Sequence, residues 1–182
     1  MALSATMYRF EINLSDVERG VYETLELRPA QHPSESDAYL VTRVLAMALE
    51  YRDDLAFGRG ISTPEDPGLS APNQMGGIDL WIEIGHPSGD LLHKVTKQAD
   101  QVVVYTHKSP EPLVAELESG DVYRGDEVTV VAFDPAFIDA VAAALTRNSK
   151  WDVLRNEGVV YVTVGDETFQ TTPTVFQERR GG

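Results

Sequence analysis

The segment from Gly77 to Gly85, GIDLWIEIG, constrains the fold of this chain more than any other. Its apolar run between glycines is typical of a buried strand. Because side chains alternate across a strand, Asp79, Trp81 and Glu83 are expected on one face, with aliphatic residues on the other. An ionised carboxylate there is costly unless it is paired, hydrogen-bonded or bound to a metal. Two carboxylates on one face therefore indicate a polar site, the alternative being an edge strand with one solvated face.

The composition indicates one globular domain, residues 1–182, because 182 residues with 42% hydrophobic and 24% charged residues suit a single packed core. The absence of cysteine excludes a disulfide framework, a thiolate zinc site and a cysteine nucleophile. The sequence has no apolar run of membrane-spanning length, and its first residues lack the features of a signal peptide. We therefore expect a cytoplasmic protein with no membrane association.

The formal net charge of −14 bears on the partners. Proteins that bind nucleic acid usually present a basic field to the phosphates, whereas this chain repels a polyanion at long range. A bound divalent cation would invert the local sign, so a nuclease is not excluded. The charge therefore disfavours nucleic acid as a partner and leaves a protein partner open.

Periodicity and turn residues predict the order of the elements. A β-hairpin is expected over 8–27, and a helix from Ser34, capped by Ser34 with Asp37, to about Arg52. The stretch from Gly58 to Ile78 has no periodicity and is expected to be a long loop, of the kind that often carries function. Further elements are expected after it, namely a strand over 78–84, a helix over 86–99, a strand over 101–106, a helix over 111–118, a strand over 127–133, a helix from Asp134-Pro135 and a β-meander over 151–176. This order predicts a mixed α/β (α+β) domain with a mixed central β-sheet flanked by helices.

The two strand carboxylates suit a hard cation such as Mg²⁺ or Mn²⁺. Residues four apart on a regular strand lie about 13 Å apart, so Asp79 and Glu83 alone do not reach one ion. Either a bulge intervenes or neighbouring elements contribute, and Glu35 at a helix start is a candidate partner. Lys94 and Gln98 lie one turn apart at the border of the following helix. Lys94 is expected to reach the sheet beside the carboxylates, or else to extend along the helix edge into solvent.

Two arginines are candidates for binding a phosphate or a carboxylate. Arg43 lies in the middle of the first helix, about two turns from Glu35, and Arg59 lies between two glycines. For each of them, a structural ion pair is the alternative explanation.

Several segments together resemble the YaeQ family of small bacterial proteins. They include the HPSE motif that ends at Glu35, then Arg43, Arg59, the GIDLWIEIG segment, Lys94 and Gln98. The resemblance spans essentially the whole chain. It implies a fold related to the PD-(D/E)XK nucleases, which is the restriction-endonuclease-like arrangement of a mixed sheet and flanking helices.

The nuclease resemblance also implies roles for individual residues. Glu35, Asp79 and Glu83 would hold one or two metal ions, and Lys94 would serve as a displaced catalytic lysine. Arg43, Arg59 and Gln98 are then the expected substrate-binding residues. The lysine of that motif belongs two residues after the acid, where this chain has Gly85.

Three functions follow from these observations. The first is a metal-dependent phosphodiester hydrolase that uses Glu35, Asp79, Glu83 and Lys94. The second is a catalytically inactive nuclease-fold module that regulates or binds another protein. The third is a small-molecule binder that uses the long loop with Arg43 and Arg59. We take the first as the leading hypothesis because it accounts for clustered acids on a core strand.

Overall fold

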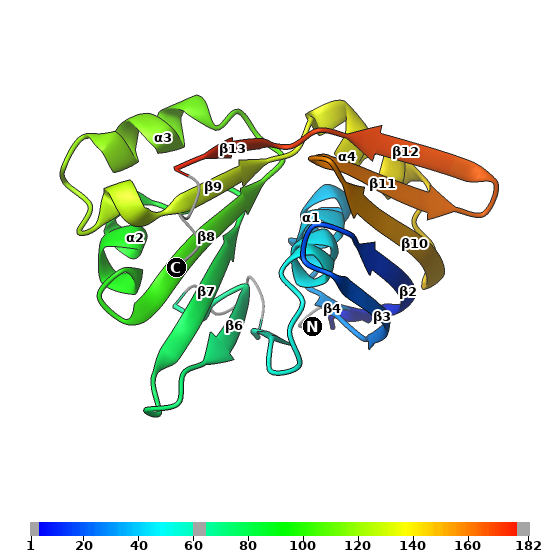
Figure 1. The fold of residues 1–182 in the computed structure, drawn as a ribbon, viewed down its shortest axis with the longest axis horizontal. Helices are drawn as coiled ribbons and strands as arrows, with labels where there is room; N and C mark the ends of the chain where they lie inside the picture. Colours follow the sequence, from blue (N-terminus) through cyan, green and yellow to red (C-terminus); the bar gives the residue numbers. More distant parts are fainter. Residues whose placement is uncertain (1–3, 60–64, 178–182) are drawn as a thin grey trace.

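The computed structural model describes residues 4–59 and 65–177, and Figure 1 shows how their helices and strands are arranged. Two large sheets face each other across helix α1 (Asp37–Leu49). A short antiparallel ribbon joins β1 (Thr6–Met7) to β4 (Ala30–Gln31). The expectation of one central sheet is therefore wrong, although the mixed α/β class is confirmed.

One sheet has five strands in the order β12-β11-β10-β2-β3. Its strands are β2 (Arg9–Asp16), β3 (Val21–Leu27), β10 (Asn148–Asn156), β11 (Val159–Val164) and β12 (Glu167–Thr171). The predicted hairpin is the antiparallel pair β2–β3, and the predicted meander is β10–β11–β12. Since β2 and β10 pair in parallel, the sheet is mixed. This pairing connects the N-terminal hairpin to the C-terminal meander.

The other sheet has six strands in the order β13-β9-β8-β7-β6-β5. Its strands are β5 (Ala56–Phe57), β6 (Leu69–Pro72), β7 (Ile78–Ile84), β8 (Ala99–Thr106), β9 (Thr129–Ala132) and β13 (Thr174–Phe176). Strand β7 lies between an antiparallel neighbour, β6, and a parallel one, β8, so its predicted interior position is confirmed. The prediction of a loop over 58–78 is wrong for β6, and residues 60–64 lie outside the described residues.

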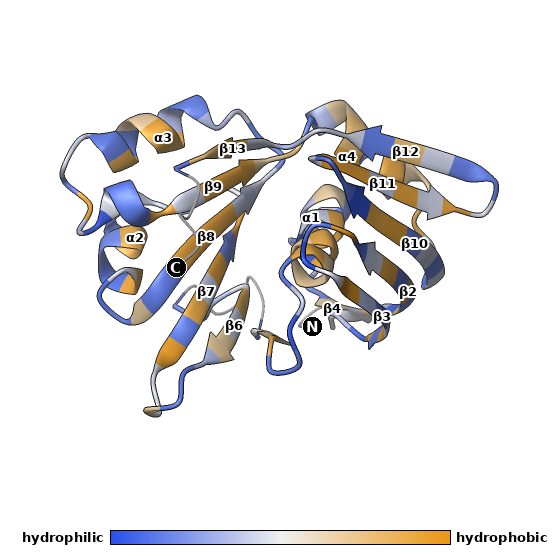
Figure 2. Cartoon of the chain, in the orientation of Figure 1, coloured by the Kyte–Doolittle hydropathy of each residue, from blue (hydrophilic) through white to orange (hydrophobic). Residues whose placement is uncertain are grey.

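Helix α1 lies between the two sheets, and every residue from Leu40 to Leu49 is buried. A helix that is apolar on nearly all sides belongs in an interior, and Figure 2 shows α1 between the two sheets with orange over much of its length. The helix begins two residues later than predicted, because the cap is Ser36, whose hydroxyl accepts the Tyr39 backbone N–H at 3.1 Å. The Ser34 hydroxyl instead lies 2.6 Å from Nδ1 of His32.

The main core joins residues of both sheets to α1, among them Ile12, Leu45 and Ile82. A second cluster covers the other face of the six-stranded sheet, where Trp81 packs with residues of α2 (Gly89–Val95) and α3 (Glu111–Glu118). Helix α2 ends earlier than predicted, and Ala99 already belongs to β8. The remaining helical elements are η1 (Gly125–Glu127) and α4 (Pro135–Ala143), the latter capped by Asp134 as predicted. Among the described residues, no helix has the length and apolarity needed to cross a membrane.

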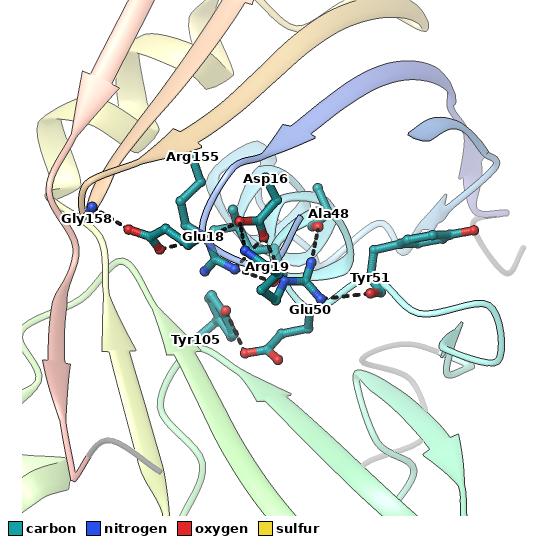
Figure 3. A network of polar contacts seen from close by, with 10 residues as sticks. Asp16, Glu18, Arg19, Ala48, Glu50, Tyr51, Tyr105, Arg155 and Gly158 are labelled. Atoms are coloured by element: carbon teal, nitrogen blue, oxygen red, sulfur yellow. Dashed lines mark hydrogen bonds and ion pairs between the residues drawn. The ribbon is translucent and has the colours of Figure 1, made fainter. Parts of the chain in front are cut away.

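A buried ion network fastens the end of α1 to the five-stranded sheet (Figure 3). Asp16 accepts from Arg155 Nη2 at 2.5 Å and from Arg19 Nε at 2.7 Å. The same arginines donate to carbonyls at the end of α1, Arg155 to Leu49 and Arg19 to Tyr51. Burial disfavours the ionised form of Asp16, but the hydrogen bonds from the two arginines prevail and lower its pKa. Cations at a helix C-terminus are also favourable, so this network stabilises the fold.

Candidate functional site

A β-bulge displaces Asp79 from the face that the sequence predicts for it. In the pairing of β6 with β7, Ala71 lies opposite Leu80 and Pro72 lies opposite Ile78, so Asp79 is the extra residue. Ile78 accordingly packs in the same cluster as Trp81, although residues three apart on an unbroken strand face opposite ways. The expectation that Asp79 shares a face with Trp81 and Glu83 is therefore wrong.

The Asp79 carboxylate contacts a cation from the α1 side of the sheet. Arg52, which follows α1, donates from Nη1 to Asp79 Oδ2 at 2.5 Å. Gln101 of β8 donates to the other carboxylate oxygen at 3.3 Å. Arg52 also holds Asp54 at 2.6 Å, which makes a small ion network at the start of β7. Asp79 is thus neutralised by a guanidinium and bound by an amide.

Glu83 lies at the opposite end of β7 and is buried, with 8% of the residue exposed. Its Oε1 accepts a hydrogen bond of 2.7 Å from Nε1 of Trp81, the residue two positions earlier on the same face. Burial raises the pKa of Glu83 to about 7, and the Trp81 hydrogen bond opposes that rise only in part. Among the ion pairs of the described residues, none involves Glu83. This carboxyl group therefore changes its charge near neutral pH.

Glu35 forms a buried ion pair with Arg43 of α1. The distance between Glu35 Oε1 and Arg43 Nη2 is 3.0 Å, and the same nitrogen donates to the Ala30 carbonyl at 2.8 Å. The Arg43 guanidinium also lies over the ring of Phe57, at 5.4 Å from the centroid. Burial raises the pKa of Glu35, while the charge of Arg43 opposes the rise. The structural ion pair that was the alternative explanation for Arg43 is therefore present. Since Arg43 is only 2% exposed, a ligand in solvent cannot reach it.

Tyr39 of α1 connects the neighbourhoods of the two glutamates. Burial raises the pKa of Tyr39 to about 12, with further contributions from the negative charges of Glu83 and then Glu35. Its ring lies against Gly85, where an added Cβ would be 3.5 Å from Cε2. We therefore define the candidate functional site as Glu83, Trp81, Tyr39, Glu35 and Arg43. Sequence reasoning missed Tyr39, because it borders the apolar stripe of α1 with no motif around it.

The remaining predicted site residues lie apart from these five. Lys94 and Gln98 are exposed, Lys94 on α2 and Gln98 in the turn after it, and Lys94 has no ion pair within the described part of the chain. Arg59 has a 77% exposed side chain and pairs with Asp66 at 2.5 Å. At the position where the nuclease motif has its lysine, Gly85 has a φ of 91°, which an L-residue adopts only with strain. Within the described residues, Lys94 thus forms no ion pair with Glu35, Asp79 or Glu83.

The carboxylates do not fit the metal site that the nuclease resemblance implies. Over residues 4–59 and 65–177, no group of three or more His, Asp or Glu side chains is placed to hold a metal ion. Asp79 is bound by Arg52 and Glu35 by Arg43, so two of the three expected ligands already have a guanidinium partner. What this site can do is take up or release a proton at Glu83 near neutral pH.

The fold and the site define a mixed α/β protein with a buried helix between two sheets and a buried carboxyl group on an interior strand. Residues 1–173 match the family model described as "YaeQ protein", so the chain belongs to the YaeQ family. It is 28% identical over 180 residues to "Uncharacterized protein YaeQ" of Escherichia coli (strain K12), which covers 98% of this chain and 99% of that protein.

Two solved structures are similar to this one. The crystal structure of the YaeQ protein from Xanthomonas axonopodis pv. citri has a TM-score of 0.86 at 32% identity, over 94% of this chain and 98% of that one. The crystal structure of the YaeQ protein from Pseudomonas syringae has a TM-score of 0.89 at 30% identity, over 97% of this chain and 98% of that one. The fold is thus that of the family.

Proposed function

We propose that this protein is a binding module built on a nuclease-like fold, and that it does not hydrolyse phosphodiesters. The order α1, β6, β7, α2, β8 agrees with the mixed sheet and flanking helices of the PD-(D/E)XK nucleases and supports kinship with them. The observation that carries the proposal is that Glu35, Asp79 and Glu83 each have a separate partner within the fold.

Recruiting these acids to a metal would be costly. Separating a buried ion pair such as Glu35–Arg43 leaves an uncompensated charge and costs about 3–5 kcal/mol. Asp79 would have to leave Arg52 and also return to the face from which the bulge has turned it. In a catalytic metal site, the ligands are held in the binding geometry before the metal arrives. Here Glu35 and Asp79 are instead held by arginines.

A protein is the partner class that the charge favours. The net charge of −14 disfavours a nucleic acid and complements a basic protein surface, which it would attract from a distance. Association through such a field is expected to be fast at low salt and to slow as salt is added.

A second candidate is the metal-dependent phosphodiester hydrolase, and one observation favours it. Glu83 has its pKa raised to about 7 on an interior strand, and groups with strongly perturbed pKa values concentrate at functional sites. In this alternative, metal binding would draw Asp79 away from Arg52 and toward Glu83.

The experiment that separates the two candidates measures the thermal unfolding of the protein with millimolar Mg²⁺ or Mn²⁺, together with cleavage of DNA, RNA and a model phosphodiester. A ligand that binds only the folded state raises the melting temperature. We expect no metal-dependent rise and no cleavage, either in the wild type or in Arg52→Gln, which releases Asp79. Arg124→Gln, which removes an exposed pair with Glu127, is the matched control. A metal-dependent rise that Asp79→Asn abolishes together with cleavage would establish the hydrolase instead.

A further inference from the structure

Three arginines that have no carboxylate partner among the described residues line one pocket on the five-stranded sheet. The pocket has a volume of about 380 Å³ and is lined by Met7, Tyr8, Arg9, Arg28, Arg147 and Asn148. Cavities that bind small organic ligands begin at about 300 Å³, so this one is large enough for such a ligand.

The pairing of the strands brings the three arginines to the same end of the sheet. Arg9 begins β2 and lies opposite Asn148 at the start of β10, and its backbone N–H donates to the Arg147 carbonyl at 2.8 Å. On its other side, the register in which Phe10 faces Leu27 brings Arg28 next to Arg9. Like charges side by side across strands destabilise a sheet. The cluster is therefore unfavourable as long as it stands alone.

The lack of partners distinguishes these residues from the other arginines. Of the nine arginines in the described part of the chain, six pair with a carboxylate and the other three are those of the pocket. The six paired arginines are Arg19, Arg43, Arg52, Arg59, Arg124 and Arg155. A chain with 29 acidic residues could easily place one beside the pocket. Within residues 4–59 and 65–177, none forms an ion pair with Arg9, Arg28 or Arg147.

The pocket also has an apolar wall. Met7 is 57% exposed, and the ring of Tyr8 stacks on Phe10 with centroids 6.3 Å apart. Burial raises the pKa of Tyr8. The negative charge of Asp37 adds to this rise, and the positive charge of Arg147 opposes it. Asp37 itself accepts a hydrogen bond from Gln31 at 2.8 Å. Apolar surface thus lies next to concentrated positive charge.

We propose that this pocket binds a small organic phosphate. The guanidiniums of Arg9, Arg28 and Arg147 would hold the phosphate by bidentate hydrogen bonds, for which arginine is well suited. Met7 and Tyr8 would contact the organic group that carries it. This site lies on the five-stranded sheet, away from Glu83 on the other sheet, and does not depend on the function proposed above.

The test is calorimetric titration of the purified full-length protein at constant ionic strength. The probes are inorganic phosphate, AMP, adenosine and an oligoadenylate. We expect AMP to bind more tightly than phosphate, and adenosine to bind undetectably. Each of Arg9→Gln, Arg28→Gln and Arg147→Gln should weaken AMP binding by about tenfold or more, because each removes charged hydrogen bonds. Arg147→Lys keeps the charge but loses the bidentate geometry, and should also weaken it.

The matched control is Lys150→Gln, which removes one charge from the same strand two residues after Asn148. We expect this variant to bind AMP as the wild type does. Equal weakening in Lys150→Gln would mean that a general field attracts the anion, and would overturn the site. Three other results would also overturn the site: AMP binding no more tightly than inorganic phosphate, no binding of AMP at millimolar concentration, or binding of the oligoadenylate alone. Since the three arginines are exposed, far-ultraviolet circular dichroism should confirm that every variant is folded.

Discussion

Replacing Glu83 with glutamine should make the protein more stable at neutral and alkaline pH. Glu83 is buried on β7, and its pKa is raised to about 7 from an ordinary 4.5. Between these values the folded protein keeps the proton that the unfolded chain has lost. The free energy of unfolding therefore falls as pH rises from about 4.5 to about 7, and levels off above that range. Glutamine removes this loss while still accepting the Trp81 N–H.

The magnitude follows from the two pKa values of Glu83. Each unit of difference corresponds to about 1.36 kcal/mol, so ionising the buried carboxyl costs about 3 kcal/mol. The stability of Glu83→Gln relative to wild type should then increase by about 3 kcal/mol between pH 4.5 and pH 8. The side-chain N–H of glutamine has no new partner, but the O–H of the protonated glutamate is in the same position, so this cost largely cancels.

The assay is urea unfolding of both proteins from pH 4.5 to pH 8, followed by tryptophan fluorescence. In thermal unfolding, the same effect should separate the melting temperatures at pH 8 by about 6–12 °C more than at pH 4.5. Glu118→Gln, at an exposed position of α3, is the control and should change stability by less than about 0.5 kcal/mol at every pH. If the wild-type and Glu83→Gln stabilities differ by the same amount across the whole range, Glu83 does not titrate near neutral pH in the folded protein.

Three further substitutions test other parts of the fold. Arg43→Met should destabilise the protein by about 3–5 kcal/mol in urea unfolding, because it leaves Glu35 buried without its cation, and Glu35→Gln in the same chain should recover much of the loss. No recovery in the double variant would mean that packing of Arg43, and not its charge, is what matters. Asp16→Asn should lower the free energy of unfolding more at pH 7 than below pH 3. The pKa of Asp16 is lowered in the folded protein, so its ionised form stabilises the fold above the unfolded pKa of 3.8, and this stabilisation is lost as pH falls through the folded pKa. A cost that does not change with pH would contradict this. Gly85→Ala should lower the stability of the fold by about 1–2 kcal/mol, measured by differential scanning calorimetry, because Gly85 has a φ of 91° and Tyr39 lies against it. An unchanged melting temperature would show that the backbone relaxes freely.

Much of the local structure can be predicted from the sequence. The alternation in β2 and β3 predicted the hairpin, and the Asn156-Glu157-Gly158 turn of the meander has positive φ at Glu157 and Gly158, as tight hairpin turns require. The interior position of β7 also followed from its own apolar residues, because a strand buried on both faces lacks polar alternation. The alternative that Arg43 is part of an ion pair was correct as well.

The parts that failed depend on neighbours distant in the sequence. Strand β6 has only four residues, Leu69–Pro72, too few for a periodic signal, and it exists because β7 offers an edge to pair with. The bulge at Asp79 arises from that same pairing, and it moves the side chain to the other face of the sheet. Arg52, 27 residues earlier in the chain, then becomes its partner.

The sequence by itself determined the helices and the longer strands, because hydrophobic periodicity, caps and turn residues act over a few residues. It also determined that an acid would lie on the buried strand, and Glu83 does. Only the tertiary structure decided that α1 lies between two sheets and that the charges of Glu35 and Glu83 both raise the pKa of Tyr39. It also decided that Arg9, Arg28 and Arg147 line one pocket. The reason is physical: the charge, register and desolvation of each of these groups are set by strands and helices that the chain brings together only on folding.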